Sequence, residues 1–305
     1  MIRDRSKLTT EKRNARSRGI DCRSTLRIVD LIHAEDAGVA RAVAKERKAI
    51  ARAVDLIVDR FRRRGRLFYV GAGTSGRLGV LDASECPPTF GVPPTLVQGI
   101  IAGGRRALVR SVEGAEDHEA DGAEAVARKR ITERDAVVGI AACGMTPFVR
   151  GALRRARRLG AATIFLTFAP ESKKYTAADV VINPVVGPEV VTGSTRMKAG
   201  TATKLVLNTL STAAMIRLGK VYDNLMVDLR ATNVKLRDRA ERIVMEVTGA
   251  GRPRARTLLK RARGRAKVAI LMHVGQVDFD EAQRLLRACG ESLRRAIRRS
   301  SRARR

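Results

Sequence analysis

Five short apolar runs, separated by stretches of helical character, limit the folds open to this chain. They occupy residues 67–70, 96–101, 137–140, 163–166 and 180–182. Runs of this length that end in turn residues are typical of strands buried on both faces, and strands that alternate with helices form parallel sheets. We expect the intervening helices to include Pro147–Leu159 and a segment near 105–112. The pattern predicts an α/β fold with a doubly wound, parallel five-stranded sheet.

Helical patterns also flank the predicted sheet. Residues before about Leu67 read as helices, with Ser24 placed to cap one of them, and a long helix is expected from Ser194 to Leu218. After residue 236 the pattern is purely helical, and Asp278 with Glu281 has the spacing of a capping pair. We predict a first domain over 1–236, with N-terminal helices and the chemistry, and a small helical domain with a basic tail over 237–305.

The charge balance bears on possible partners. The chain has 61 basic and 31 acidic residues, a formal net charge of +30. This excess favours anionic ligands and raises nucleic-acid binding as an alternative. However, most basic clusters fall on predicted solvated helix faces, and aromatic residues suited to stacking on bases make up only 3%. Nucleic acid is therefore expected only through a non-specific basic surface, most plainly residues 294–305.

Cysteine spacing and hydropathy indicate the compartment. The four cysteines stand far apart without a CxxC pair, so neither a disulfide framework nor a metal site is predicted. The N-terminus lacks an apolar signal core, and no apolar run reaches membrane-spanning length. We expect a reduced, cytoplasmic protein that contacts no membrane.

A glycine-rich turn follows the first predicted strand and opens a helix. Its sequence is GAGTSG at 71–76, which formally matches the G-x-G-x-x-G pattern of dinucleotide-binding folds. That alternative requires a carboxylate after the second strand, where this chain has Ala102, Gly103, Gly104 and Arg105. Hydroxyls beside helix-terminal amides instead suit a phosphate monoester. The predicted phosphate-binding residues are Gly73, Thr74, Ser75 and Gly76.

Two further turns have a similar design. Residues 141–147 follow the third predicted strand, and Pro147 is well placed as the first residue of a helix. The candidate ligand-binding residues in this turn are Cys143, Gly144 and Thr146. A third turn, residues 192–195, precedes the long helix and contributes Ser194. Because ligands of doubly wound sheets bind at the carboxyl ends of strands, the three turns together predict an anionic phosphosugar as ligand.

Two glutamates are candidate acid–base residues. Pro87 and Pro88 are expected to end the helix that begins at the first turn. Glu85 would then lie near a helix C-terminus, where the dipole favours the protonated carboxyl of a general acid. Glu116 lies just beyond the next predicted helix. Taken singly, each glutamate is equally consistent with an ordinary solvated acid at a helix end.

Several sequence blocks resemble a known family. They are GAGTSGRLG at 71–79, LDASECPPTFG at 81–91, VEGAED at 112–117, VTGSTRMKAGTA at 191–202, KLVLN at 204–208 and NLMVD at 224–228. These blocks are similar to the signatures of N-acetylmuramic acid 6-phosphate etherases, and the resemblance runs from about Thr10 to Ile297. It implies a sugar isomerase (SIS) fold and a homodimer.

The resemblance also implies an activity. Etherases of this family cleave N-acetylmuramic acid 6-phosphate to N-acetylglucosamine 6-phosphate and D-lactate by elimination and then hydration, with neither metal nor nicotinamide cofactor. By similarity Glu116 corresponds to the base and Glu85 to the acid. The turn residues named above correspond to the groups that hold the sugar phosphate.

The chain departs from the family at two positions, which leaves alternatives open. Cys143 stands where serine is usual and Met145 where arginine is usual, so a hydroxyl donor and a charge-assisted contact are lost. These changes and the basic surface favour a non-catalytic sugar-phosphate-binding regulator of the glucokinase regulatory protein type. The presence of both glutamates favours the enzyme. A nicotinamide-dependent enzyme ranks last, because the ribose-binding acid is missing.

Overall fold

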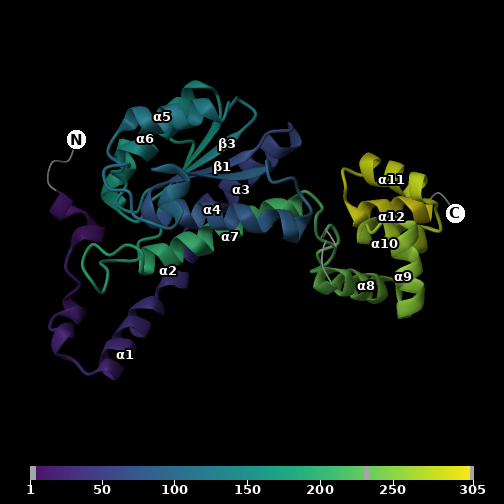
Figure 1. Cartoon of the computed structure of the whole chain (residues 1–305), viewed down its shortest axis with the longest axis horizontal. Helices are drawn as coiled ribbons and strands as arrows, with labels where there is room; N and C mark the ends of the chain where they lie inside the picture. The colour runs from purple at the N-terminus through teal and green to yellow at the C-terminus, as the bar shows by residue number, and fades with distance from the viewer. Residues whose placement is uncertain (1–4, 230–233, 303–305) are drawn as a thin grey trace. The chain divides into compact units, whose positions relative to one another are not determined.

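The computed structural model describes residues 5–229 and 234–302. It contains a parallel sheet of five strands in the order β2-β1-β3-β4-β5 (Figure 1). Every residue of β1, β3 and β4 is buried, as expected for a sheet covered on both faces. The predicted α/β class and parallel five-stranded sheet are confirmed. The strands are β1 Leu67–Gly71, β2 Val97–Ile101, β3 Ala136–Ile140, β4 Ala162–Leu166 and β5 Val180–Ile182.

Helices cover the sheet on both sides (Figure 1). One face packs against α5 and α6 through a core that includes Phe68, Val126, Val137, Phe148 and Phe165. The other face lies against α3, α4 and α7. The chain before the sheet also forms α1 and α2. These helices are α1 Thr25–Asp36, α2 Val39–Lys45, α3 Arg47–Arg62, α4 Gly73–Phe90, α5 Glu119–Arg128, α6 Pro147–Arg158 and α7 Lys198–Arg217.

A buried carboxylate joins α4 and α7 to the sheet. Asp82 of α4 is 5% exposed. It accepts hydrogen bonds from the Tyr69 hydroxyl of β1 at 2.9 Å and from Asn208 and Ser211 of α7 at 2.7 and 3.1 Å. Buried polar groups stabilise a fold only when they are paired. This contact therefore explains why an aspartate and an asparagine occur in two of the sequence blocks noted above.

Three sequence predictions about helices were wrong. Residues 5–22 form short 3₁₀ turns (Arg5–Lys7, Thr9–Glu11, Ala15–Ser17 and Ile20–Cys22), and α-helix begins only at Thr25. The helix expected near 105–112 is a 3₁₀ turn over Gly104–Leu108, and the α-helix between β2 and β3 is α5. A further 3₁₀ turn spans Pro170–Tyr175.

The third error concerns the prolines. Pro87 and Pro88 lie inside α4, which continues to Phe90. A proline lacks the hydrogen bond to the carbonyl four residues earlier and its ring crowds that carbonyl, so it disturbs the turn before it. The turn after it closes normally here, because the Gly91 amide donates to the Pro87 carbonyl at 3.0 Å. Glu85 is therefore not at the end of its helix.

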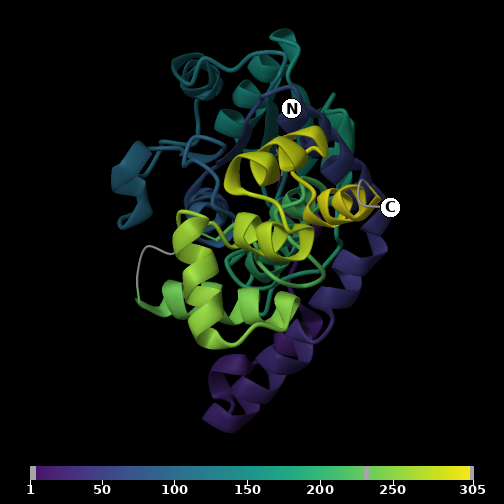
Figure 2. The ribbon, with the colours of Figure 1, turned by 90° about the vertical axis from the view of Figure 1, so that its right-hand side faces the viewer.

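By residue contacts the chain divides into two compact units, residues 1–84 with 95–211 and residues 85–94 with 212–305. The second unit contains α8 Val234–Thr248, α9 Arg252–Arg261, α10 Ala266–Gly275, α11 Phe279–Ala288 and α12 Leu293–Arg302 (Figure 2). The predicted division into domains 1–236 and 237–305 stays a prediction. No helix among the described residues is long and apolar enough to cross a membrane.

The second unit is built around α10. Val268, Ala269, Ile270 and Leu271 of this helix are fully buried in one apolar cluster. The Lys267 ammonium is buried with them and is paired with Asp228. The predicted cap of α11 is confirmed, since the Asp278 side chain accepts from the Glu281 amide at 2.8 Å. The basic tail is helical as far as Arg302, and residues 303–305 lie outside the described part of the chain.

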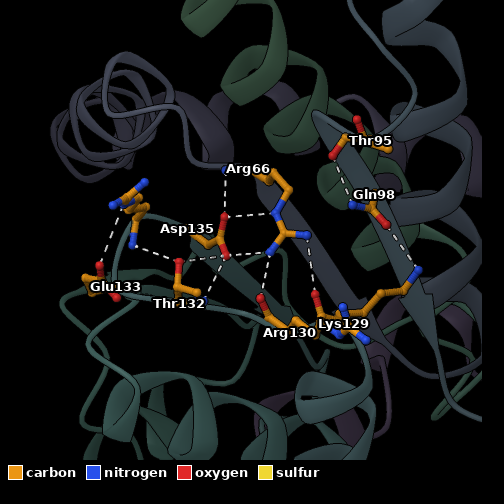
Figure 3. Close-up of polar contacts among 9 residues, drawn as sticks. Arg66, Thr95, Gln98, Lys129, Arg130, Thr132, Glu133 and Asp135 are labelled. Atoms are coloured by element: carbon orange, nitrogen blue, oxygen red, sulfur yellow. Dashed lines mark hydrogen bonds and ion pairs between the residues drawn. The ribbon is translucent and has the colours of Figure 1, made fainter.

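An ion pair between the buried Asp135 and the half-buried Arg66 joins the amino ends of β1 and β3 (Figure 3). Asp135 is 1% exposed and receives hydrogen bonds from the Arg66 amide at 2.8 Å, from the Arg66 guanidinium at 2.8 and 3.1 Å, and from the Thr132 amide at 2.9 Å. Burial alone would raise the pKa of Asp135. The hydrogen bonds from Arg66 and Thr132 outweigh burial and hold the pKa below its ordinary value of 3.8.

This geometry predicts a pH-dependent loss of stability in Asp135→Asn. Because the folded-state pKa is depressed, the carboxylate contributes its full stabilisation above the unfolded-state pKa, and the contribution disappears as pH falls through the folded-state value. At pH 7 the substitution should lower the free energy of unfolding by about 2–3 kcal/mol. The difference from wild type should shrink below about pH 3.8. Denaturant titrations of the variant and the wild type at pH 7 and below about pH 3.8 measure this difference in the free energy of unfolding.

Glu133→Gln is the matched control. This neighbouring carboxylate is exposed, and its ion pair with Arg134 is long, at 3.7 Å. Its loss should therefore lower the free energy of unfolding by less than about 0.5 kcal/mol. Equal destabilisation of the two variants, or a difference that persists at low pH, would contradict the assigned role of Asp135.

Candidate functional site

The strand order places two of the predicted turns side by side. β1 lies between β2 and β3, so the chain leaves β1 toward one edge of the sheet and returns to start β3 on its other side. Gly71, the last residue of β1, is opposite Ile140, the last of β3. Ligands of doubly wound sheets bind at this point of reversal, beyond the carboxyl ends of the strands. The turns after β1 and β3 therefore form the candidate site.

The first turn leads directly into α4. Gly73 begins the helix with a φ of +50°, a conformation that favours glycine. Thr74 and Ser75 are half-buried. Within the described part of the chain, no hydrogen bond is found for the amides of residues 73–75. Open amides at the positive end of a helix dipole, next to two hydroxyls, favour an anion, so this turn remains the predicted phosphate position.

The second turn is fixed by residues that follow β4. The Ala142 carbonyl accepts from the Phe168 amide at 2.9 Å and from the Thr167 hydroxyl at 3.2 Å. Gly144 has a φ of +75°, and a Cβ there would lie 2.1 Å from Ser172 Oγ. α6 begins at Pro147, as predicted, with Thr146 at its N-cap position. Side chains beyond β4 therefore hold this turn in one conformation.

Cys143 and Met145 of this turn pack in the same small apolar cluster but differ in burial. Cys143 is half-buried, whereas Met145 is 4% exposed and packs against Leu8 and Ala169. Met145 is therefore a core residue of the turn. A residue from the start of the chain, Leu8, covers it.

The third turn lies beside the first but leads to a helix whose N-terminus is already capped. A Cβ built on Gly200 would lie 3.6 Å from both the Thr195 carbonyl and the Thr74 methyl group, so the two turns are neighbours. The buried Glu189 carboxylate accepts from the Lys198 amide at 3.0 Å and the Ala199 amide at 2.9 Å. These are the first two amides of α7. Ser194, half-buried in the turn, remains a predicted contact.

Burial raises the pKa of the Glu189 carboxyl that caps α7. Glu189 is 1% exposed, and desolvation raises its pKa despite the hydrogen bonds from the two α7 amides. Its neighbour Lys198 forms a buried ion pair with Glu35 of α1. The start of α7 is thus tied to the N-terminal helices.

The two predicted acid–base residues are both exposed in this chain. Glu85 lies on α4, twelve residues beyond its first residue, Gly73. Glu116 lies in the segment before α5, and its carbonyl accepts from the Phe148 amide of α6 at 3.0 Å. That hydrogen bond places Glu116 next to the second turn.

Two glycines allow this placement of Glu116. A Cβ on Gly151 of α6 would lie 1.9 Å from the Glu119 carbonyl, and one on Gly122 of α5 would lie 1.8 Å from the Phe148 carbonyl. Both obstacles are backbone atoms, which cannot rotate away. α5 and α6 therefore cross in close contact because each has a glycine at the crossing, and the segment before α5 is held against the start of α6.

Sequence reasoning missed the segment that crosses these turns, residues 8–14, which we call the N-terminal strap. It contacts Met145 through Leu8, Glu171 through Thr9, and the Pro188 carbonyl through Asn14. The signal that could have identified it is the lack of apolar periodicity before residue 24, which argues against the helix expected there. Among the described residues no cluster of His, Cys, Asp or Glu has the arrangement of a metal site.

The glycine crossing predicts that Gly151→Ala is destabilising. The methyl group would force α5 and α6 apart, which should lower the free energy of unfolding by about 2–3 kcal/mol in denaturant titrations. Gly200→Ala is the control, since that helical glycine has room for a Cβ at 3.6 Å from its neighbours, and it should be neutral or stabilising. Equal stability of the two variants would show that the helices can separate without cost.

Comparisons with known proteins find similarity over part of the chain and over nearly all of it. Residues 49–157 match the family model of the glucokinase regulatory protein N-terminal SIS domain. A phosphoheptose isomerase from Neisseria gonorrhoeae superposes with a TM-score of 0.46 at 16% identity, covering 63% of this chain and 99% of that one.

Similarity over the whole chain is much higher to another group of proteins. An N-acetylmuramic acid 6-phosphate etherase of Nostoc is 52% identical over 97% of this chain and 96% of its own length. The protein of the same name from Salinibacter ruber is 54% identical over 95% of this chain and 94% of its own. With that identity over nearly its entire length, the chain belongs to the N-acetylmuramic acid 6-phosphate etherase family.

Proposed function

We propose that this protein is an etherase that converts N-acetylmuramic acid 6-phosphate and water to N-acetylglucosamine 6-phosphate and D-lactate. The observation that carries the proposal is the identity of 52–54% to proteins of that name over 95–97% of the chain. The geometry is consistent with it, because the glycine-rich turn after β1 and the backbone of Glu116 lie at the carboxyl edge of β1 and β3.

In this proposal the first turn binds the phosphate. The amides of Gly73, Thr74 and Ser75 point from the start of α4, and the two hydroxyls add donors. Gly76 allows α4 to lie close to the sheet, since a Cβ there would be 2.6 Å from Ile101. The second turn, with Cys143, Gly144 and Thr146, and Ser194 of the third turn would contact the rest of the sugar.

The chemistry assigns separate roles to the two glutamates. The aldehyde of the open-chain sugar acidifies the proton on C2, which Glu116 removes as the base. The electron pair forms a C2–C3 double bond while the C3–O bond to lactate breaks, and Glu85 protonates the departing oxygen. Water then adds across the double bond, which restores a hydrogen at C2 and leaves a hydroxyl at C3. Each proton transfer contributes about 10²–10⁴-fold to the rate.

The position of Glu85 on α4 supports a homodimer. Twelve residues of helix separate it from Gly73, about 18 Å along the axis. A single sugar phosphate cannot easily contact both positions of one helix. We therefore propose that Glu85 of the partner subunit completes the site formed by the first turn and Glu116.

We also propose that the enzyme acts in the cytoplasm in recycling of cell-wall amino sugars, since its substrate is a phosphorylated sugar.

A non-catalytic regulator that binds sugar phosphates is the second candidate. The match of residues 49–157 to the glucokinase regulatory protein SIS domain favours it, as does Met145, whose buried apolar side chain supplies no charge to the turn. Such a protein would bind N-acetylglucosamine 6-phosphate without releasing lactate from the muramic acid substrate.

Lactate release from purified protein tests the main proposal. The wild type should release D-lactate from N-acetylmuramic acid 6-phosphate, and Glu85→Gln and Glu116→Gln should each lower kcat at least about 100-fold, because an amide cannot transfer the proton. Glu113→Gln, an exposed neighbour of Glu116 that accepts from Ser111, should stay within about twofold of wild type. Wild-type protein that binds the sugar phosphate but releases no lactate would indicate the regulator instead.

Mixing the two inactive variants tests the shared site. If Glu85 and Glu116 of one site come from different subunits, each mixed dimer has one intact site, and random exchange restores about a quarter of wild-type activity. Subunits are exchanged by mild dissociation and reassociation, and each variant treated alone is the control. No recovery in dimers shown to be mixed would place both glutamates of a site on one chain.

A further inference from the structure

The N-terminal strap is fixed on both sides of a carboxylate that the proposed mechanism does not use. The Thr9 hydroxyl donates to Glu171 at 2.8 Å, and the Asn14 amide group donates to Glu35 at 2.8 Å and to the Pro188 carbonyl at 3.2 Å. Leu8 and Thr10 are 0% and 1% exposed. The strap is therefore held firmly at residues before and after Glu11.

Glu11 faces the third turn. It ends a short 3₁₀ turn, closed by the bond from its amide to the Leu8 carbonyl at 2.9 Å. Its Oε2 lies 3.5 Å from the position that a Cβ on Gly193 would occupy. Because the third turn is the neighbour of Thr74, Glu11 lies at the same edge of the sheet as the candidate phosphate site.

The carboxylate of Glu11 keeps its capacity to accept hydrogen bonds. Although basic residues outnumber acidic ones by 61 to 31, no ion pair of Glu11 is found within residues 5–229 and 234–302. Its Oε1 receives a long contact of 3.4 Å from the Thr10 hydroxyl. The nearby Glu171 and Glu35, by contrast, accept the hydrogen bonds that anchor the strap. A carboxylate has about four acceptor positions, so most of those on Glu11 are available to a ligand.

Charge determines which part of a sugar phosphate fits there. A carboxylate repels phosphate and the lactyl carboxylate, whereas the open N-terminus of α4 attracts them. We propose that Glu11 is a further substrate-binding residue, which accepts a hydrogen bond from a neutral hydroxyl or amide N–H of the sugar. It thereby orients the sugar with its phosphate at the first turn. This role rests on the proposed function.

Kinetics of Glu11→Ala and Glu11→Gln test this role. Loss of a hydrogen bond to a charged acceptor should raise KM for N-acetylmuramic acid 6-phosphate about tenfold or more in Glu11→Ala. The inhibition constant of inorganic phosphate, which probes the phosphate position alone, should be unchanged. Glu11→Gln should be closer to wild type, because its amide oxygen still accepts. Glu133→Ala, an exposed carboxylate at the amino edge of the sheet, is the control and should leave both constants unchanged.

Two results would overturn the role of Glu11. One is a KM in Glu11→Ala within twofold of wild type. The other is an equal rise in KM and in the phosphate inhibition constant, which would mean that the turn has been displaced. Thermal unfolding of each variant shows whether the strap stays folded.

Calorimetric titration with N-acetylglucosamine 6-phosphate separates this role from the etherase activity. If the wild type releases no lactate, the proposed function fails. About tenfold weaker binding of this ligand by Glu11→Ala, with unchanged phosphate binding, would still support Glu11 as a sugar contact. Absence of both lactate release and sugar-phosphate binding in the wild type would overturn both proposals.

Discussion

The site depends on the pairing of β1 with β3, and the buried contact between Arg66 and Asp135 fixes that pairing at its start. The Ala136 amide also donates to the Arg66 carbonyl at 2.8 Å, so the two strands begin in register. Strands are short and rigid, so a register fixed at one end determines what meets at the other. Gly71 and Ile140 therefore end side by side, and the turns that follow them form one edge.

The three helices that start at this edge differ in what satisfies their first amides. α4 leaves its amides open and adds two hydroxyls. At α6 the Phe148 amide is taken by the Glu116 carbonyl, and at α7 the buried Glu189 carboxylate occupies the first two amides. An anion gains most where amides are not already bonded. This difference favours the start of α4 as the phosphate position. The start of α6 instead holds the backbone of Glu116, and the start of α7 is held by Glu189 after the third turn.

Much of the fold could be predicted from the sequence because its signals are local. Short apolar runs separated by helical stretches identified all five strands, and Pro147 and Asp278 marked a helix start and a cap. The errors arose where tertiary contacts decide. α5 buries only Gly122 and Val126, so its apolar periodicity is weak, yet its close crossing with α6 stabilises it. α4 continues past two prolines to Phe90, and the turn that follows them closes through the Gly91 amide.

The candidate site was predictable only in part. The residues of the turns were recognisable by glycines and hydroxyls, and Glu85 and Glu116 by resemblance to a family. The strap was not, since Leu8, Thr9 and Asn14 find their partners more than a hundred residues away, at Met145, Glu171 and Pro188. A single sequence contains no local sign of such pairings. It also contains no sign that the Glu189 carboxylate caps the start of α7.

Hydrogen–deuterium exchange with and without N-acetylglucosamine 6-phosphate would test most directly whether the carboxyl edge of β1 and β3 binds the sugar phosphate. Peptides that cover 72–77, 142–149 and the N-terminal strap should exchange more slowly in the presence of the ligand, because bound amides and closed turns open less often. Peptides from α8 to α12 serve as an internal reference for the same sample. Binding that leaves exchange at 72–77 unchanged, or that protects only residues elsewhere, would contradict the account.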